Sequence, residues 1–257
     1  MHLKKCFHNM LMNTTLNHTV VQTDKLTLHK YKEHLLMKYE GQPLLIQTPW
    51  LNINAFGMPR RDKYHTTDDQ LKYIKLPLDT NVEDIKQFHD LLQTIDNKVN
   101  NADFRKEHLG EKHNKYAYNT VLTEKENKPV SVKFKFMTTR DEIQDISTQL
   151  YKTKNKQRTQ IRNPTIDDFI KHIPFRSTVR CIFQIVKVWS QPATLKNPTY
   201  GLTLKLHKIE VNDKPKYNIE CVFIDDDDDD DKLSIDAQHY HISSDDEERL
   251  MVITSNN

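Results

Sequence analysis

Glycine is scarce in this chain. Its 257 residues include only four glycines, and no two are close enough in sequence to form a dinucleotide-binding turn or a phosphate-binding loop. The zinc-protease, nucleophile-elbow and protein-kinase motifs are also absent. These absences give little support to the common nucleotide-binding and hydrolytic enzymes. We therefore expect a protein without enzymatic activity and without a cofactor.

Cysteine is equally scarce. The three cysteines, an odd number with no CxxC pair, are Cys6, Cys181 and Cys221. This pattern is typical of reduced structural thiols in a cytoplasmic or nuclear compartment. Two short pairs resemble metal ligands, Cys6 with His8 and His239 with His241, but neither has a second pair at zinc spacing. We expect no metal site.

Long hydrophobic runs are missing as well. No apolar stretch approaches the ~18 residues of a membrane helix, and the apolar residues near the start are interrupted by His and Asn, unlike a signal peptide. Hydrophobic residues make up 36% of the chain, charged residues 29%, and the mean hydropathy is −0.77. This composition still allows one real core, and it predicts no membrane partner.

Charge is present but unevenly distributed. Residues 225–257 hold twelve acids and two bases, a net charge of −10, and the other 224 residues hold 36 bases against 24 acids, a net charge of +12. Seven of the acids are consecutive: Asp225, Asp226, Asp227, Asp228, Asp229, Asp230 and Asp231. Such a run is often only a solvated tail or loop. The asymmetry also supports a second interpretation, in which a basic body binds a polyanion that the acidic segment imitates.

Apolar periodicity indicates a mostly β, α+β fold. Alternation predicts strands within 19–48, 71–79, 116–137, 177–189, 199–211 and 216–224. A 3.6-residue period predicts an amphipathic helix over 81–99, with Thr80 and Glu83 at capping-box spacing. Short helices are expected after Thr139, reaching Leu150, and over 165–173. Because helices do not alternate with strands, we expect a small closed antiparallel barrel with elaborations.

Several segments combine aromatic and basic residues. Single strands are held by a positive groove along the phosphates and by aromatic faces that stack on bases. The candidate nucleic-acid-binding residues are Trp50, Arg60, Arg61, Lys63, Tyr64, Lys72, Tyr73, Lys75, Lys133, Lys135, Lys152, Lys154, Lys156, Arg158 and Lys205. The alternative is that Trp50 and Phe56 plug the end of the barrel, which we favour for Phe56, and that the lysines only confer solubility.

Three motifs carry a family resemblance. They are "IQTPWLNINAFGMPR" at 46–60, "VRCIFQIVKVW" at 179–189 and "YGLTLKLHKIEV" at 200–211. Together, and in this order around the helix, they resemble a family of single-stranded DNA-binding proteins of nucleo-cytoplasmic large DNA viruses. The resemblance spans roughly residues 19–224. It implies an OB-like barrel similar to phage replication single-strand binding proteins, some of which end in an acidic tail. Here the chain continues beyond the acidic run, so a free tail and a loop before a last strand both stay open.

The resemblance and the charge pattern lead to one overall hypothesis. Residues 1–18 form an N-terminal extension, 19–224 an OB-like nucleic-acid-binding domain, and 225–257 an acidic C-terminal segment. The domain binds single-stranded DNA in viral replication, recombination or repair, and the acidic segment regulates access or recruits replication proteins. The alternative is a structural or scaffolding protein of the virion or viral factory. The expected location is the viral factory in the host cytoplasm, or the nucleus; packaging in the virion and a dimeric state stay open.

Overall fold

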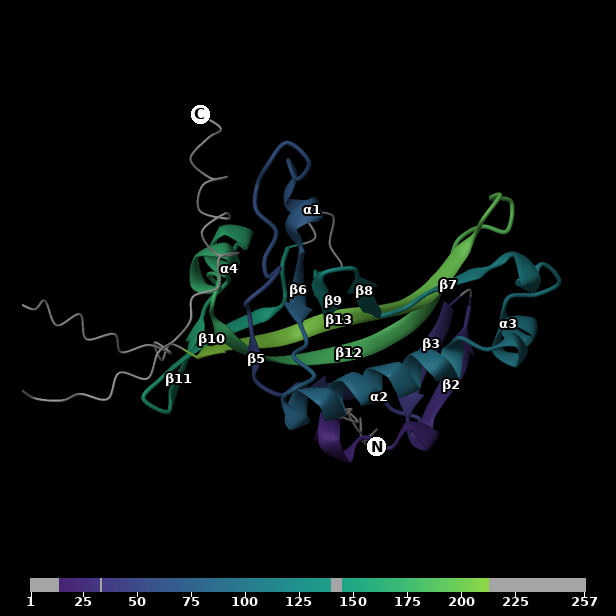
Figure 1. Ribbon diagram of the computed structural model, residues 1–257, viewed down its shortest axis with the longest axis horizontal. Coiled ribbons are helices and arrows are strands. Elements are labelled where there is room, and N and C mark those ends of the chain that lie inside the picture. The colour runs from purple at the N-terminus through teal and green to yellow at the C-terminus, as the bar shows by residue number, and fades with distance from the viewer. Residues whose placement is uncertain (1–13, 33, 140–144, 213–257) are drawn as a thin grey trace, which may run out of the picture. The chain divides into compact units, whose positions relative to one another are not determined.

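The computed structural model describes residues 14–32, 34–139 and 145–212. Within these ranges the chain has four α-helices, and thirteen strands belong to one mixed sheet (Figure 1). The helices are α1 Asp68–Leu71, α2 Glu83–Val99, α3 Ala102–His108 and α4 Ile166–His172. The strands are β1 Thr14–Asn17, β2 Leu26–Tyr31, β3 His34–Tyr39, β4 Leu44–Gln47, β5 Leu51–Asn52, β6 Tyr73–Pro77, β7 Ala117–Asn119, β8 Leu122–Lys125, β9 Lys128–Phe136, β10 Gln149–Lys154, β11 Gln157–Ile161, β12 Thr178–Ser190 and β13 Thr199–Asn212. The predicted mostly β fold class is confirmed.

Strands β12 and β13 are the two longest strands of the sheet. They pair antiparallel, from Thr178 opposite Asn212 to Ser190 opposite Tyr200. Apolar residues occupy alternate positions of β12, so their side chains are buried on one face while polar side chains point to the other. The register shifts beside Phe183 and Ile185 are bulges, which bend the pair.

The strand pairings around β12 and β13 form a series that runs from β5 at one side to β6 at the other. Strand β9 pairs with β13, β6 pairs with β9, and β5 pairs with β12. The segment that follows β5 then contacts β6 through an isolated bridge, in which the Gly57 and Lys75 backbones exchange hydrogen bonds of 2.8 and 3.1 Å, and this contact brings the two sides of the series together. Gly57 has a φ of +91°, and a Cβ there would lie 2.9 Å from Cγ2 of Ile53. Only glycine fits this closure without strain.

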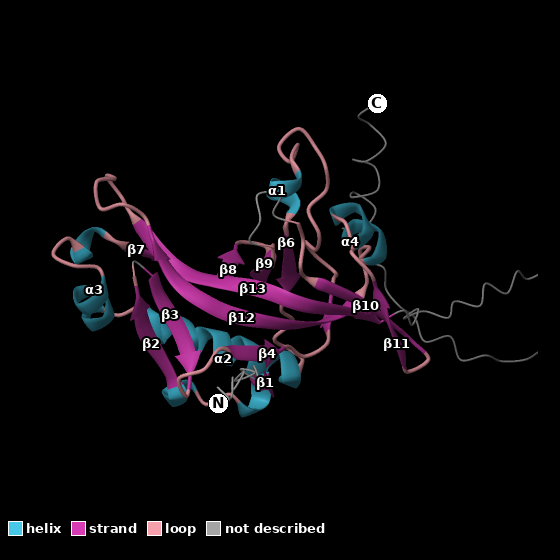
Figure 2. Cartoon of the chain, turned by 180° about the vertical axis from the view of Figure 1, so that it is seen from behind, coloured by secondary structure: helices cyan, strands magenta, loops and turns pink. Residues whose placement is uncertain are grey.

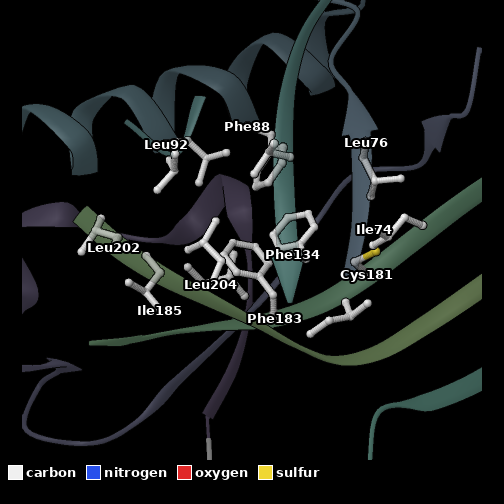
Figure 3. Packing of buried hydrophobic residues seen from close by; sticks show 14 of the residues in the cluster. Ile74, Leu76, Phe88, Leu92, Phe134, Cys181, Phe183, Ile185, Leu202 and Leu204 are labelled. Atoms are coloured by element: carbon white, nitrogen blue, oxygen red, sulfur yellow. The ribbon is translucent and has the colours of Figure 1, made fainter. Parts of the chain in front are cut away.

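Helix α2 runs alongside the long strand β12, as Figure 1 shows. Its predicted apolar stripe is confirmed, since Ile85, Phe88, Leu92 and Ile95 are buried. Phe88 packs edge-to-face on Phe183 of β12, with ring centroids 6.0 Å apart (Figure 3). The capping box predicted for Thr80 and Glu83 is wrong, because the helix begins at Glu83 and its N-cap residue is Val82.

The sheet contains parallel pairs that the predicted antiparallel barrel did not include. They are β1–β4, β10–β13, β7–β13 and β9–β13. Strand β1 begins at Thr14, so the sheet includes residues before the predicted domain start at 19. Strand direction depends on long-range pairing, which local alternation does not encode.

The segment after β9 also differs from its prediction. Leu150, expected at the end of a short helix, belongs to β10, and Ile146 forms a bridge with Thr138. The basic segment after Leu150 is the β10–β11 hairpin. Its turn residues Asn155 and Lys156 have φ values of 50° and 66°, typical of a type I′ turn. Figure 2 shows this hairpin at the opposite end of β12 and β13 from β2 and β3.

Two parts of the prediction lie outside the described residues. They are the strand expected at 216–224 and the acidic segment with Asp225 to Asp231. Within the described residues, no helix is long and apolar enough to cross a membrane.

Candidate nucleic-acid interface

Three neighbouring strands place lysines on the outer surface of the barrel. Tyr73 of β6 lies opposite Lys135 of β9, and Lys75 lies opposite Lys133. Lys135 in turn lies opposite Lys205 of β13. Because registered partners share one face of a sheet and neighbouring strands lie about 4.8 Å apart, these side chains form one continuous surface. We call Tyr73, Lys75, Lys133, Lys135 and Lys205, together with Phe56, the basic face.

Two aromatic rings on the basic face contact lysine ammonium groups. The Nζ atom of Lys133 lies 3.7 Å from the centroid of the Tyr73 ring, and Nζ of Lys75 lies 4.1 Å from that of Phe56. Such cation–π contacts orient both partners. Phe56 has a φ of 61° and is half-buried beside Lys75, outside the buried core. The expectation that Phe56 plugs the barrel is therefore wrong, because the left-handed turn before Gly57 directs its ring to the surface.

The positive charges of the basic face are not offset by carboxylates. Within the described residues, no ion pair joins an acid to Lys75, Lys133, Lys135 or Lys205. Partial burial lowers the pKa of Lys133, and the neighbouring Lys135 and Lys75 lower it further. Burial and nearby lysines likewise lower the pKa of Lys205 and of Lys75. A bound polyanion would relieve this repulsion.

The loop between β5 and β6 holds a second group of predicted residues, and acids already pair with some of them. Arg61 contacts Asp68 at 2.6 Å and Asp167 at 3.6 Å, and Lys72 contacts Asp69 at 2.7 Å. The remaining three residues of this group, Arg60, Lys63 and Tyr64, are exposed. The Tyr64 side chain is 70% exposed, with Nζ of Lys63 lying 5.0 Å from its ring centroid.

A third group lies near the β10–β11 hairpin, at one end of β12. The ring of Trp50 lies 4.6 Å from the guanidinium carbon of Arg180 on β12. Arg180 and Arg158 both donate to the carboxylate of Glu210, at 2.8 and 3.0 Å. Lys154 and Lys156 are exposed at the hairpin turn, and Lys152 is half-buried on β10. Trp50 therefore packs on the outside of β12, where it does not close the barrel.

Thr48 holds the segment from Gln47 to Trp50 alongside β12. The Thr48 N–H donates to the Cys181 carbonyl oxygen at 2.9 Å, and the Cys181 N–H donates to the Thr48 hydroxyl oxygen at 3.0 Å. Thr48 is 1% exposed. This exchange extends the β4–β12 pairing by one residue, and it places Trp50 over Arg180.

No protein-family profile matches the chain. It is 22% identical over 204 residues to the uncharacterized protein R505 of Acanthamoeba polyphaga mimivirus. That match covers 65% of this chain and 50% of the mimivirus protein, so this chain spans about half the length of its relative.

Solved structures that are similar to this chain include phage proteins. One is gp2.5, a single-stranded DNA-binding protein encoded by bacteriophage T7, with a TM-score of 0.43 and 9% identity over 68% of this chain and 89% of that chain. Another is the single-stranded DNA-binding protein from bacteriophage Enc34, solved as a C-terminal truncation, with a TM-score of 0.38. A structure of the Enc34 protein in complex with single-stranded DNA gives a TM-score of 0.37. Both Enc34 structures are 12% identical over 76% of this chain and 99% of that chain.

Other surface residues lie near the candidate site. The polar face of its strand already indicated His207, whereas Arg180 and Gln184 were missed by the sequence analysis. His207 and Gln184 lie between the basic face and the Arg180 cluster, joined by a hydrogen bond of 3.1 Å. Burial, and then Lys208, lower the pKa of His207. The outward positions of "VRCIFQIVKVW" would have indicated Arg180 and Gln184, because they alternate with the apolar residues of that strand.

Proposed function

We propose that this protein binds single-stranded DNA without catalysing a reaction on it. The observation that carries the proposal is the basic face, where four lysines that have no acidic partner among the described residues share one surface with two aromatic rings. Phosphates attract such lysines regardless of sequence, and unstacked bases pack on such rings. Duplex DNA hides its base faces in the stack, so the rings favour single strands.

The positions of the four lysines on the basic face predict how a DNA strand contacts it. Lys75 to Lys205 span β6, β9 and β13, so a strand that crosses these three β-strands meets each lysine in turn. Four phosphate contacts would give a slope of about −3 for log affinity against log salt, at about −0.7 per contact.

The finer part of the proposal concerns viral DNA replication, recombination or repair. It is supported by the family resemblance of the three motifs and by the 22% identity with a mimivirus protein. We also propose that Asp225 to Asp231 compete with DNA for the basic face and recruit replication proteins when DNA displaces them. The charge difference, −10 against +12, supports this regulation.

A titration over a salt series tests the proposal. Labelled single strands, duplexes and RNA of equal length are titrated with the full chain, and log affinity is plotted against log salt. Single strands should bind more tightly than duplexes, with a linear negative slope. Absence of binding to single strands at low salt would overturn the proposal. That result would favour the alternative of a structural or scaffolding protein of the virion or viral factory.

A further inference from the structure

A small hollow lies on the outer surface of the sheet where β4, β12, β13 and the β10–β11 hairpin meet. Its volume is about 150 Å³. That volume equals about five water molecules at ~30 Å³ each, which is enough for one planar ring system. Ile182 contributes an apolar side chain to the lining. The polar lining residues are Gln47, Tyr151, Arg158, Arg180, Lys208 and Glu210.

The walls of this hollow are held in place before any ligand arrives. Glu210 is only 9% exposed and accepts hydrogen bonds from Thr153 at 2.5 Å, Arg180 at 2.8 Å and Arg158 at 3.0 Å. Burial opposes ionisation of Glu210, but these three donors outweigh it and lower its pKa. Arg180 is fixed a second time by the ring of Trp50. Two arginines are therefore oriented by one buried carboxylate.

The chemistry of the lining favours a base over a phosphate. Glu210 offsets part of the charge of Arg158 and Arg180, so an anion gains less here than on the basic face. The hollow instead offers a tyrosine ring, guanidinium planes and the Gln47 amide. Proteins recognise splayed-out bases with these groups, by stacking on aromatic rings or Arg planes and by hydrogen bonds to the base edge.

The hollow and the basic face belong to one surface. Strand β13 carries both Lys205 and Glu210, five positions apart, which corresponds to about 17 Å at ~3.3 Å per residue. His207 and Gln184 lie between them. A DNA strand that crosses the basic face as far as Lys205 and then turns along β13 therefore reaches the hollow.

We propose that this hollow binds one nucleobase of the DNA strand whose backbone crosses the basic face. The proposal rests on the proposed function. It predicts that one position of the bound strand differs from its neighbours in how much its base contributes to affinity.

Abasic scanning tests this inference. The oligonucleotide is first trimmed to the shortest length that keeps full affinity, so that it does not slide, and one abasic residue is then placed at each position in turn. The phosphates stay intact, so only base contacts are lost. Removing the base that occupies the hollow should weaken binding about five- to a hundredfold, the range of one stacked base. Equal penalties at all positions would overturn the proposal.

Variants of Tyr151 test whether the loss of affinity at the sensitive abasic position arises in the hollow. Tyr151→Ala should remove the abasic penalty at that one position, whereas Tyr151→Phe, which keeps the ring, should retain it. Lys205→Gln should weaken every oligonucleotide similarly and keep the positional pattern. If the parent binds single strands but Tyr151→Ala leaves the pattern unchanged, the hollow is not the base site, while the proposed function stands. If the parent binds no single strand, the proposed function itself fails.

Tryptophan fluorescence gives a second readout that does not depend on affinity. Trp50 and Trp189 are the two tryptophans of the chain, and Trp189 lies on the opposite end of β12 from Arg180. In a Trp189→Phe variant the remaining emission comes from Trp50, which contacts Arg180. Saturating parent oligonucleotide should change this emission, and the oligonucleotide that is abasic at the sensitive position should not. Identical changes with both would contradict the inference.

Discussion

The ammonium group of Lys133 lies 3.7 Å from the centre of the Tyr73 ring, across the β6–β9 pairing. The side chains belong to residues sixty positions apart in sequence, and the antiparallel register brings them onto one face. A cation over one side of the ring leaves a polarised aromatic surface among lysines that pair with no acid in the described part of the chain. This arrangement combines the two kinds of contact that single-stranded nucleic acids need.

Tyr73→Ala should weaken binding of single strands by ~1–3 kcal/mol and leave the salt slope unchanged, because stacking releases no counterions. Tyr73→Phe keeps the ring and is the matched control, so it should bind like the parent. The measurement is a titration of labelled single strands at several salt concentrations. A slope that becomes shallower in Tyr73→Ala would show that the ring acts by placing Lys133.

Replacing lysines of the basic face with glutamine should make the slope of log affinity against log salt less negative. Lys133→Gln and Lys135→Gln should each reduce its magnitude by about 0.7, the value of one phosphate contact with a single strand. The control is Lys86→Gln, since Lys86 is exposed on α2, outside the basic face. Equal slopes in all three variants and the parent would place the phosphate contacts elsewhere, with the β10–β11 hairpin as the next candidate.

Neutralising the acidic run should increase affinity at low salt. Replacing Asp225 to Asp231 with Asn keeps the length of the chain and removes seven charges that compete with DNA at the effective concentration of a tethered segment, ~mM for a short flexible link. The gain should shrink as salt rises, because ions screen the competition. Titrations of parent and variant at matched salt measure it, and unchanged affinity at low salt would exclude the competing segment.

DNA affinity should rise as the pH falls below neutral, through His207. Burial and Lys208 lower the pKa of His207 in the free protein, so both favour its neutral ring. A nearby phosphate favours the protonated ring and raises its pKa, so the complex binds more protons than the free protein and acid tightens binding. His207→Gln should flatten this part of the pH profile.

The same histidine should affect stability in the opposite direction. A depressed histidine pKa means that the unfolded chain binds more protons below its ordinary pKa of about 6.5, so stability falls as the pH drops through that value. Urea titrations of the free protein and DNA titrations across pH 5–8 separate the two effects. If His207→Gln and the parent show identical pH profiles for affinity, then His207 does not contact DNA.

Gly57→Ala should destabilise the barrel at its narrow closure. The left-handed φ of +91° costs an L-residue ~1–2 kcal/mol, and the new Cβ would meet Ile53 at 2.9 Å, so the total loss in free energy of unfolding should be about 2–4 kcal/mol. Gly110→Ala is the matched control, with a φ of +74° and no atom within 4 Å of its Cβ. Gly110→Ala should lower the free energy of unfolding only by the cost of the left-handed φ. Urea denaturation compares them, and equal losses would show that the contact with Ile53 relaxes freely.

The sequence by itself determined the elements whose signal is local. Alternation predicted the buried Ile74 and Leu76 of β6 and the outward Lys133 and Lys135 of β9, because the two-residue period of a strand fixes which face each side chain takes. The 3.6-residue period predicted α2 in the same way. Both signals survive folding because they describe how each segment buries its own apolar residues.

Only the tertiary structure decided which of these surfaces meet. The β6–β9–β13 pairing places Tyr73 next to Lys135, and Lys135 next to Lys205, and it includes a parallel pair that no local pattern specifies. It also determined that Arg61 faces Asp68 and Asp167, and that Trp50 packs on Arg180. A residue type gives the charge of a side chain, but the partner of that charge depends on which distant segments the barrel brings within a few ångströms.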